Sequence, residues 1–249
     1  MITTKNHVTE LLSLCAKIPK NLEPQAAPGT WEVALKQMPA PGHVLIVGSG
    51  RGGLSWILSK AGYTVTNVDI HPEHFRVEQQ TCSFVDANQP LPFPDEQFDA
   101  VLAIEVLEHL ENPSLFIRES VRVLKNEGAS IITSPNLENI VSRLLFIAKG
   151  HFPYFREQSF QGCYHVSPIF SWTIDRACRT GGATLQRIAY SRTDWPNKND
   201  VPQHYRNRIT RFIKSSIPAR MLTGEISCYF IKKNSEKGAT QVIPNQHYK

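Results

Sequence analysis

The stretch from His43 to Gly53, His-Val-Leu-Ile-Val-Gly-Ser-Gly-Arg-Gly-Gly, constrains the fold more than any other part of the chain. The apolar run 44–47 predicts a buried strand, glycines follow at once, and 53–61 has the pattern of a helix. Glycine allows a tight turn and lets a ligand or a helix approach the backbone closely. The N–H groups at the start of such a helix can bind a polar ligand. The pattern therefore predicts the first half of a βαβ unit with a ligand site at its turn.

The glycine spacing alone leaves three interpretations open. Gly48, Gly50 and Gly53 fit G-x-G-x-x-G, which is typical of dinucleotide-binding proteins. Gly48, Gly50 and Gly52 fit G-x-G-x-G, which suggests S-adenosylmethionine as the ligand. The third interpretation is an ordinary glycine turn in an α/β domain that binds no nucleotide. Residues further along the chain have to decide among them.

Apolar runs and helical patterns alternate along the rest of the chain. The run 100–104 is continuously apolar, which indicates a strand buried on both faces and hence a parallel central sheet. Asn112 and Pro113 are a favoured cap and a favoured first residue of a helix. The pattern predicts strands over 43–47, 63–69, 81–85, 99–104, 129–133, 183–191 and 225–232, and helices over 4–18, 31–36, 53–61, 113–125, 139–149 and 168–180. Such alternation is typical of an α/β doubly wound fold.

Length and composition narrow the class of protein. A chain of 249 residues with 41% hydrophobic residues fits one large domain. A net charge of +5 is small for a nucleic-acid binder, so we expect no nucleic-acid partner. The five cysteines are scattered and include no C-x-x-C pair, which predicts neither a zinc site nor a disulfide framework. No signal peptide or membrane span is visible in the sequence, and we expect a cytoplasmic protein.

Five segments together carry a resemblance to a known family. They read Val-Leu-Ile-Val-Gly-Ser-Gly-Arg-Gly from 44, Val-Asp-Ile from 68, Val-Asp-Ala from 85, Leu-Pro-Phe-Pro-Asp-Glu-Gln-Phe-Asp from 91 and Glu-Val-Leu-Glu-His-Leu-Glu-Asn-Pro from 105. Over 40–135 the chain resembles the class I S-adenosylmethionine-dependent methyltransferases, and the piece from Leu91 to Pro113 is the most specific part. The resemblance implies a Rossmann-like, doubly wound sheet of seven strands, mostly parallel with the last strand antiparallel, and helices on both faces. It also implies S-adenosylmethionine as the cofactor instead of a nicotinamide.

The resemblance assigns roles to residues at the strand ends. The glycines would hold the methionine part and the ribose of the cofactor, Asp69 the ribose hydroxyls, and Asp86 the adenine amino group. The full implied set is Gly48, Ser49, Gly50, Gly52, Asp69, Ile70, Asp86, Ala87, Ile104 and Glu105. One position departs from the family pattern, because Ile46 stands where an acid usually meets the cofactor's ammonium group. This departure keeps open a homologue that binds or regulates without catalysing.

The later part of the chain bears on the methyl acceptor. Ser-Pro-Asn from 134 and His-Val-Ser-Pro from 165 loosely resemble the family members that act on sugars or other small hydroxylated metabolites. We therefore expect methyl transfer to a hydroxyl or amine of a small metabolite, such as a sugar or sugar nucleotide; a lipid or macromolecular acceptor is the alternative. His165 and His109 are the candidates for taking the acceptor's proton, because histidine titrates near neutral pH. A structural role for either histidine is the other interpretation. No metal-binding cluster stands out in the sequence, so we expect a metal-independent reaction.

Two segments are candidates for the acceptor side. Residues 151–164 are rich in aromatic side chains, which indicates either a lid with Tyr164 as a substrate contact or a hydrophobic cluster under a loop. Residues 201–223 contain Lys and Arg but no acid, which is typical of a basic amphipathic helix. Arg208 and Arg211 would then bind an anionic substrate such as a phosphorylated metabolite; a solvated face, or contact with a membrane surface, which we do not favour, are the alternatives.

The predicted organisation is a single domain over 1–249. Its parts are an N-terminal helical cap over 1–40, a core over 41–192 and 224–234, insertions on the acceptor side over 151–166 and 193–223, and a polar tail over 235–249.

Overall fold

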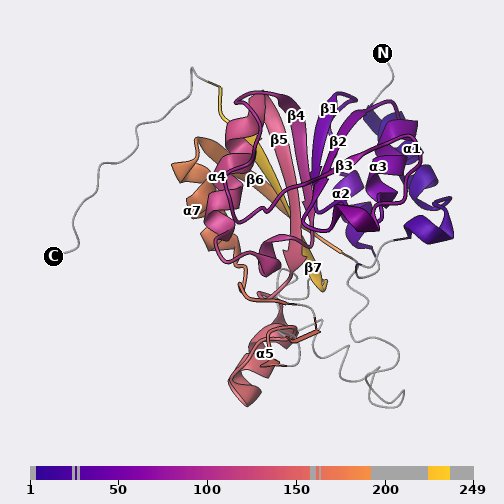
Figure 1. Cartoon of the computed structure of the whole chain (residues 1–249). Coiled ribbons are helices and arrows are strands. Elements are labelled where there is room, and N and C mark those ends of the chain that lie inside the picture. Colours follow the sequence, from indigo (N-terminus) through magenta and orange to yellow (C-terminus); the bar gives the residue numbers. More distant parts are fainter. Residues whose placement is uncertain are drawn as a thin grey trace.

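A seven-stranded sheet forms the centre of the computed structural model, which describes residues 4–23, 26, 29–157, 161–162, 164–191 and 224–235 (Figure 1). Its strands are β1 (His43–Val47), β2 (Thr64–Asp69), β3 (Cys82–Phe84), β4 (Phe98–Ile104), β5 (Leu124–Pro135), β6 (Ala183–Tyr190) and β7 (Ile226–Lys233). The α-helices are α1 (Thr4–Cys15), α2 (Thr30–Leu35), α3 (Gly53–Lys60), α4 (Pro113–Val123), α5 (Ile140–Lys149) and α7 (Ser171–Thr180). Short 3₁₀ helices are η1 (Lys20–Leu22), η2 (Pro72–His74) and η3 (Leu107–His109).

The strand order is β3-β2-β1-β4-β5-β7-β6, and neighbouring strands are parallel except where β7 is involved. The chain starts in the middle of the sheet at β1, moves out to β3, and returns through β4 toward the other edge. The order therefore reverses between β1 and β4, and in open sheets of this kind ligands bind outside the carboxyl ends of the strands at that point. The predicted doubly wound sheet with an antiparallel last strand is confirmed.

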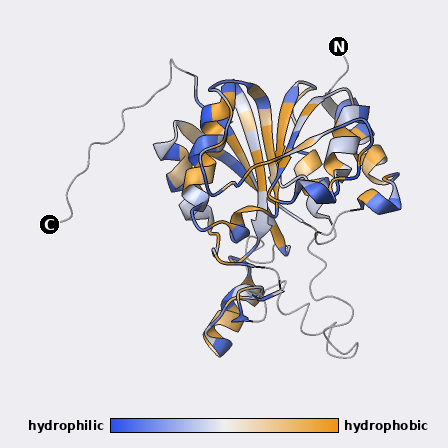
Figure 2. Cartoon of the chain, in the orientation of Figure 1, coloured by the Kyte–Doolittle hydropathy of each residue, from blue (hydrophilic) through white to orange (hydrophobic). Residues whose placement is uncertain are grey.

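Helices cover both faces of the sheet and bury its side chains in two cores (Figure 2). Leu45 and Val47 of β1 pack in the core that includes residues of α4 and α7, whereas Val44 and Ile46 pack in the core that includes residues of α1, α2 and α3. Burial on both faces explains the continuous apolar run in β4, as expected for a central parallel strand. Burying each such aliphatic side chain stabilises the fold by about 1.5–3 kcal/mol. The buried sheet therefore holds the residues at its carboxyl edge in fixed positions.

The predicted and observed boundaries differ most between α4 and β5. Helix α4 starts as predicted, with the Asn112 side chain accepting the N–H of Leu115. It ends earlier than predicted, at Val123, and β5 begins directly after it at Leu124. Leu124 is extended and pairs with Phe98 of β4 before an irregularity in the pairing. Pairing with a strand far away in the sequence therefore overrides the local turn signal on which the prediction rested.

The start of α7 also differs from the prediction. The helix is expected to open at 168 but begins at Ser171. The backbone N–H groups of 166–167 donate to the Glu108 carbonyl at 2.8 and 3.0 Å, which ties this segment to η3 instead. The Glu138 carboxylate then accepts both the N–H and the hydroxyl of Ser171, at 2.9 and 3.0 Å. A carboxylate is favourable at a helix start, so the tertiary contact sets where α7 begins.

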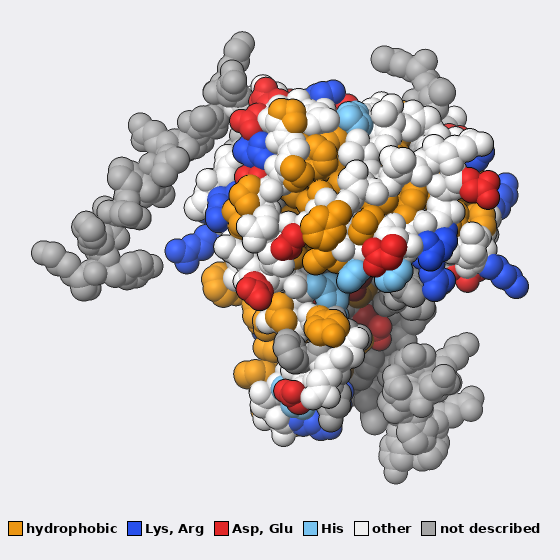
Figure 3. Space-filling model, viewed as in Figure 1, with side chains coloured by type: hydrophobic (Ala, Val, Ile, Leu, Met, Phe, Trp, Pro, Cys, Tyr) orange, Lys and Arg blue, Asp and Glu red, His pale blue; other side chains and the backbone are white. Residues whose placement is uncertain are grey.

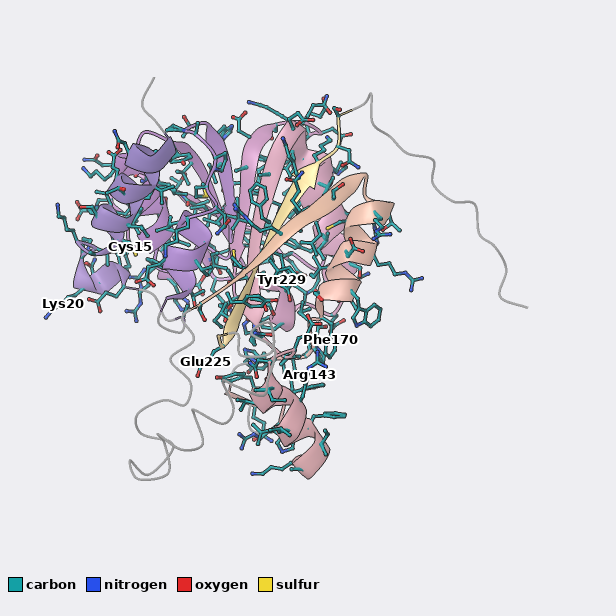
Figure 4. All side chains as sticks on the ribbon, turned by 180° about the vertical axis from the view of Figure 1, so that it is seen from behind. Cys15, Lys20, Arg143, Phe170, Glu225 and Tyr229 are labelled. Atoms are coloured by element: carbon teal, nitrogen blue, oxygen red, sulfur yellow. The ribbon has the colours of Figure 1, made fainter. Side chains whose placement is uncertain are left out.

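The carboxyl edge of the sheet faces the lower part of Figure 1, and α5 projects beyond it. Seen from behind in Figure 4, Arg143 of α5, Phe170 and Glu225 lie toward this end of the molecule. The helix carries exposed apolar side chains, among them Leu144 and Ile147, which are 56% and 80% exposed. None of the helices in the described ranges is long and apolar enough to span a membrane.

Candidate functional site

A cavity of about 530 Å³ lies at the carboxyl edge of the sheet and is lined by the ends of β1 and β4. Its volume is within the range of about 300–1,000 Å³ that is typical of small-molecule sites. Residues of the turn Gly48–Gly53, except Gly52, form the part of the lining that we call the glycine end. Glu105, Glu108, His109 and His165 form the part that we call the histidine end. Figure 3 shows histidine and acidic side chains near one another across the middle of the face in view; Glu108 is fully buried and does not belong to this surface.

Backbone conformation shapes the glycine end. Gly48 and Gly50 have φ angles of 74° and 52°, in the left-handed region that favours glycine. A Cβ on Gly48 would lie 2.5 Å from Cγ2 of Val106, whereas a Cβ on Gly50 would meet nothing within 4 Å. Gly48 donates its N–H to the Val68 carbonyl at 3.0 Å, which holds the turn against β2. Gly50 therefore leaves open space beside its backbone, where a ligand can approach.

The rest of the turn leads into α3. Gly52 is the N-cap of α3, with a φ of 88° in the left-handed region. The Ser49 hydroxyl donates to the Ile46 carbonyl at 3.1 Å, so this side chain holds the turn together. Trp31 lines the cavity from the N-terminal segment and lies against Gly53, where an added Cβ would contact its ring.

Asp69 ends β2 beside the glycine turn. Its carboxylate accepts the N–H of Gly50 at 2.7 Å and the N–H of His71 at 2.8 Å. Each oxygen can accept a further hydrogen bond, so these two contacts orient the carboxylate without exhausting it. Asp69 and Ile70, which is 50% exposed, are not among the residues that line the cavity, but the turn that contacts Asp69 does line it.

Asp86 lies in a loop and not at the end of a strand. β3 ends at Phe84, short of the predicted 81–85, and Asp86 lies in the loop beyond it. Its carboxylate accepts the N–H of Asn88 at 2.9 Å, and Ala87 is buried in the core. Neither Asp86 nor Ala87 is among the residues that line the cavity. Their roles at the adenine stay predictions.

Ile46 is 1% exposed and packs in the core, so it offers the cavity no polar group. The acids that line the cavity come from elsewhere: Glu23 precedes α2, and Glu105 and Glu108 follow β4. The carboxyl groups that could meet a cationic ligand in the cavity therefore come from segments other than β1.

Glu105 has an unusual backbone conformation. Its φ of 55° lies in the left-handed region, which non-glycine residues rarely adopt. The Thr133 hydroxyl accepts the N–H of Glu105 at 3.0 Å and donates to its carboxylate at 2.8 Å. Burial raises the pKa of the Glu105 carboxyl, and the bond from Thr133 lowers it by less. Ile104 and Glu105 both line the cavity, and strain of this kind often marks a functional site.

Glu108 is a site residue that the sequence did not reveal. Its side chain is 0% exposed to solvent and lines the inner wall of the cavity. Within the described residues, neither carboxylate oxygen has a hydrogen-bond partner. Burial raises its pKa well above the usual range, and Glu105 raises it further; nearby Ser134 lowers it by less, without hydrogen-bond geometry. An unpaired buried carboxylate costs several kcal/mol, so this group requires a proton or a cation.

His109 and His165 come together at the histidine end although they lie far apart in the sequence. Their ring centroids are 4.8 Å apart and the rings are inclined by 72°. Nδ1 of His165 lies 3.1 Å from the Tyr154 carbonyl, which accepts a hydrogen from it. Burial lowers the pKa of His165, and the neighbouring His109 lowers it further. Tyr154 lines the cavity, whereas Tyr164 is 65% exposed and is not among the lining residues.

The arrangement fits S-adenosylmethionine, the cofactor that the resemblance implies. Open space beside Gly50 admits a ligand to the backbone, and the adjacent Asp69 carboxylate can accept bonds from hydroxyl groups. Arg51 lines the same end and suits a carboxylate, while Glu105 offers a negative charge to a cationic group.

Sequence reasoning missed Glu108 and Tyr154. The segment Glu-Val-Leu-Glu-His does place Glu108 between two predicted site residues, but nothing local indicates that its side chain is buried. Tyr154 contributes through its backbone carbonyl, which no side-chain pattern reveals. Arg208 and Arg211, with the rest of the predicted basic helix over 201–223, lie outside the described residues.

Comparison with known proteins agrees with this geometry. A family described as a methyltransferase domain matches residues 45–132. The demethylmenaquinone methyltransferase of Tropheryma whipplei (strain Twist) is 33% identical over 96 residues, which cover 36% of this chain and 40% of that protein. The 2-methyl-6-phytyl-1,4-hydroquinone methyltransferase of a Synechocystis strain is 34% identical over 110 residues, 41% of this chain and 35% of that protein. The chain thus spans two-fifths or less of the length of these curated relatives.

A solved structure extends the likeness beyond the matched region. A methyltransferase from Archaeoglobus fulgidus that depends on S-adenosylmethionine superposes with a TM-score of 0.57 and 21% identity, over 78% of this chain and 86% of that one. At this level of identity the likeness shows the fold alone.

Proposed function

Because residues 45–132 belong to the class I S-adenosylmethionine-dependent methyltransferases, with S-adenosylmethionine as the cofactor, we propose that this protein methylates a hydroxyl or amine of a small acceptor. The observation that carries the proposal is one cavity of about 530 Å³ that is lined both by the glycine turn and by two histidines. We assign the acceptor to the part of the cavity that the two histidines line. The protein is therefore suited to bringing a methyl donor and an acceptor together.

The glycine end would hold the cofactor. When bound, the cofactor supplies an electrophilic methyl group: the acceptor's lone pair forms the new C–O or C–N bond, and the electrons of the broken C–S bond stay on sulfur. Gly50 leaves space for the ligand against its backbone, and the remaining lone pairs of Asp69 accept the ribose hydroxyls. Both groups are fixed before binding, so they orient the donor at little entropic cost, and orientation is a large part of the catalysis of such displacements.

The histidine end would hold the acceptor. His109, His165 and Tyr154 line it, and aromatic and imidazole rings suit a cyclic hydroxylated molecule such as a sugar. His165 or His109 would take the acceptor's proton at this end, as the sequence predicts. Arg208 and Arg211 would add positive charge for a phosphorylated acceptor, as the sequence predicts.

A second acceptor class is a quinol-like ring with an apolar tail. The names of two relatives refer to a menaquinone precursor and to a phytyl hydroquinone. On this chain, exposed apolar side chains favour the same chemistry: Phe146, Ile147 and Tyr164 are 45%, 80% and 65% exposed. An apolar tail that leaves the cavity would cover such side chains.

The test is a titration followed by a product screen. Calorimetric titration with S-adenosylhomocysteine should give saturable binding, and S-adenosylmethionine with panels of sugars, sugar nucleotides and quinols should give a product heavier by one CH₂ group. His165→Ala should lower the turnover number at least about tenfold, a loss of the size expected for a group that contacts the reacting atoms. It should leave the affinity for S-adenosylhomocysteine unchanged. His74→Ala, an exposed histidine that does not line the cavity, is the matched control.

Two outcomes would overturn the proposal. Absence of any binding of either ligand would remove the cofactor assignment. Binding without any product across the panels would favour the catalytically silent homologue that Ile46 suggests, because Ile46 supplies no acid to the cofactor's ammonium group.

A further inference from the structure

Three potential metal ligands meet at the histidine end. Glu108, His109 and His165 each offer one ligand atom, and these atoms all lie within 4.8 Å of one another. We call them the Glu–His–His cluster. The two contributing segments are joined by backbone bonds, since 166–167 donate two N–H groups to the Glu108 carbonyl at 2.8 and 3.0 Å. The closeness of the three side chains therefore rests on a fixed backbone arrangement.

Glu108 points to a positively charged ligand. It is fully buried, it lines the cavity, and neither of its oxygens has a hydrogen-bond partner within the described residues. Buried carboxylates are ordinarily paired with a cation or bonded to donors. Among the described residues that line the cavity, Arg51 of the glycine turn is the one Lys or Arg, and no ion pair between it and Glu108 is found in the described ranges. A metal ion bound by the two neighbouring histidines would supply the missing positive charge.

A hydrogen bond to the backbone fixes the tautomer of His165. Its Nδ1 faces the Tyr154 carbonyl at 3.1 Å, so that Nδ1 carries the hydrogen and Nε2 carries the lone pair. Histidines that bind metals generally donate their other ring N–H to a carbonyl or carboxylate in this way. The backbone of Tyr154, with a φ of 67°, is in the uncommon left-handed region while it presents this carbonyl.

We propose that Glu108, His109 and His165 bind a divalent transition-metal ion at the histidine end of the cavity. Two imidazole nitrogens and one carboxylate oxygen form a donor set that suits Zn²⁺, Co²⁺, Fe²⁺ or Mn²⁺, whereas Mg²⁺ and Ca²⁺ prefer oxygen ligands alone. Three protein ligands leave a coordination position open, which is typical of sites that bind a substrate or water.

The role of the ion, though not its binding, rests on the proposed function. An acceptor hydroxyl that coordinates to the ion would be positioned next to the donor and would lose its proton to solvent more readily. His165 would then be a metal ligand instead of the proton acceptor that the sequence suggests. The expectation of a metal-independent reaction came from a sequence in which His165 stands far from Glu108, so that the cluster is visible only in the folded chain.

The direct test uses tag-free full-length protein stripped with EDTA. Titration with Zn²⁺ or Co²⁺ should show one ion per chain, Co²⁺ should give visible absorption bands of an ordered site, and Mg²⁺ should bind far more weakly. Glu108→Gln and His165→Gln should each weaken Zn²⁺ binding at least about tenfold, because removing even an outer-shell partner has an effect of that size. Neither measurement requires cofactor or acceptor.

A group of the same composition provides the control. His71, Glu73 and His74 lie on the surface around η2, with Nδ1 of His71 3.1 Å from the Glu73 carboxylate, but they do not converge on the cavity. Glu73→Gln should leave Zn²⁺ binding unchanged. Thermal unfolding of each variant shows whether it folds; if Glu108→Gln does not, His165→Gln decides, since its side chain is only partly buried.

Each outcome has a definite meaning. The proposal is overturned if the stripped protein binds none of these ions at one equivalent, or if Zn²⁺ binding survives in the variants of the cluster. Binding that is lost in the cluster variants supports the proposal even if no acceptor is ever methylated, in which case the proposed function alone fails. Full methyl transfer by the metal-free protein would overturn the role of the ion in acceptor binding.

Discussion

The two ends of the cavity are built in different ways. The glycine end is a contiguous turn, Gly48–Gly53, shaped by backbone conformation and held to β2 by backbone hydrogen bonds. The histidine end combines the segment after β4, Thr133 of β5 and His165 from the loop before α7. It is held by the hydrogen bonds between the Thr133 hydroxyl and Glu105 and by the backbone bonds from 166–167 to the Glu108 carbonyl. One end thus depends on local geometry and the other on the packing of three segments.

The region that this chain shares with its relatives contains all of the glycine end but only part of the histidine end. The family match over 45–132 contains the glycine end, Asp69 and the segment with Glu108, but it stops before Thr133, Tyr154 and His165. A backbone turn that fits a common cofactor can be used with many acceptors. We propose the histidine end as the acceptor side, and its residues Tyr154 and His165 lie beyond the match, so we expect specificity to be decided partly there.

Among the substitutions at the two ends of the cavity, we expect Gly48→Ala to have the largest effect on stability and on cofactor binding. The left-handed φ of 74° disfavours alanine by about 1–2 kcal/mol, and contact with Val106 adds an overpacking cost of about 1–3 kcal/mol. We expect a lower unfolding free energy in urea and at least about tenfold weaker binding of S-adenosylhomocysteine. Gly62→Ala is the control, since Gly62 has a similar φ of 87° but nothing within 4 Å of an added Cβ. Equal losses of affinity in both variants would mean that the glycine end is not the cofactor site.

A smaller effect is expected at the histidine end from Thr133→Val. This change keeps the shape of the side chain but leaves the Glu105 N–H and carboxylate without the Thr133 hydroxyl, which should cost about 1–3 kcal/mol of unfolding free energy. Ser130→Ala on the same strand is the matched control, because the buried Ser130 hydroxyl has no hydrogen-bond partner among the described residues. Similar unfolding midpoints for the two variants would show that the histidine end does not depend on this side-chain contact.

The smallest predicted effect is a difference in affinity for S-adenosylhomocysteine between variants of Asp69 and Asp86, the two acids proposed to bind the cofactor. Asp69→Ala should weaken binding of S-adenosylhomocysteine more than Asp86→Ala, by roughly 1–2 kcal/mol, because a charged acceptor for two ribose hydroxyls outweighs one bond to an amino group. The structure supports the order, since Asp69 contacts the glycine turn whereas Asp86 bonds within its own loop. Calorimetric titration measures both, and Asp69→Asn controls for local distortion. The reverse order would contradict the ribose assignment.

Much of the fold follows from local pattern. The bounds of β1 match the prediction, and Asn112 caps α4 as expected, because a strand run and a helix cap each depend on a few neighbouring residues. The early start of β5 and the late start of α7 do not follow, because Leu124 is positioned by β4 and Ser171 by Glu138. Where a contact with a distant segment sets the first residue of a helix or strand, the neighbouring sequence does not indicate it.

The same division holds for the site. By itself the sequence determined the sheet, the glycine turn and the acid at the end of β2, because apolar periodicity and glycine positions act on the chain within a few residues. Only the tertiary structure decided that Glu108 is buried and that His109 and His165 lie side by side. Whether a carboxyl group loses its water, and which imidazole becomes its neighbour, depends on segments that meet in space after the sheet has formed. Those contacts carry the electrostatic chemistry of this protein, and no spacing in the sequence encodes them.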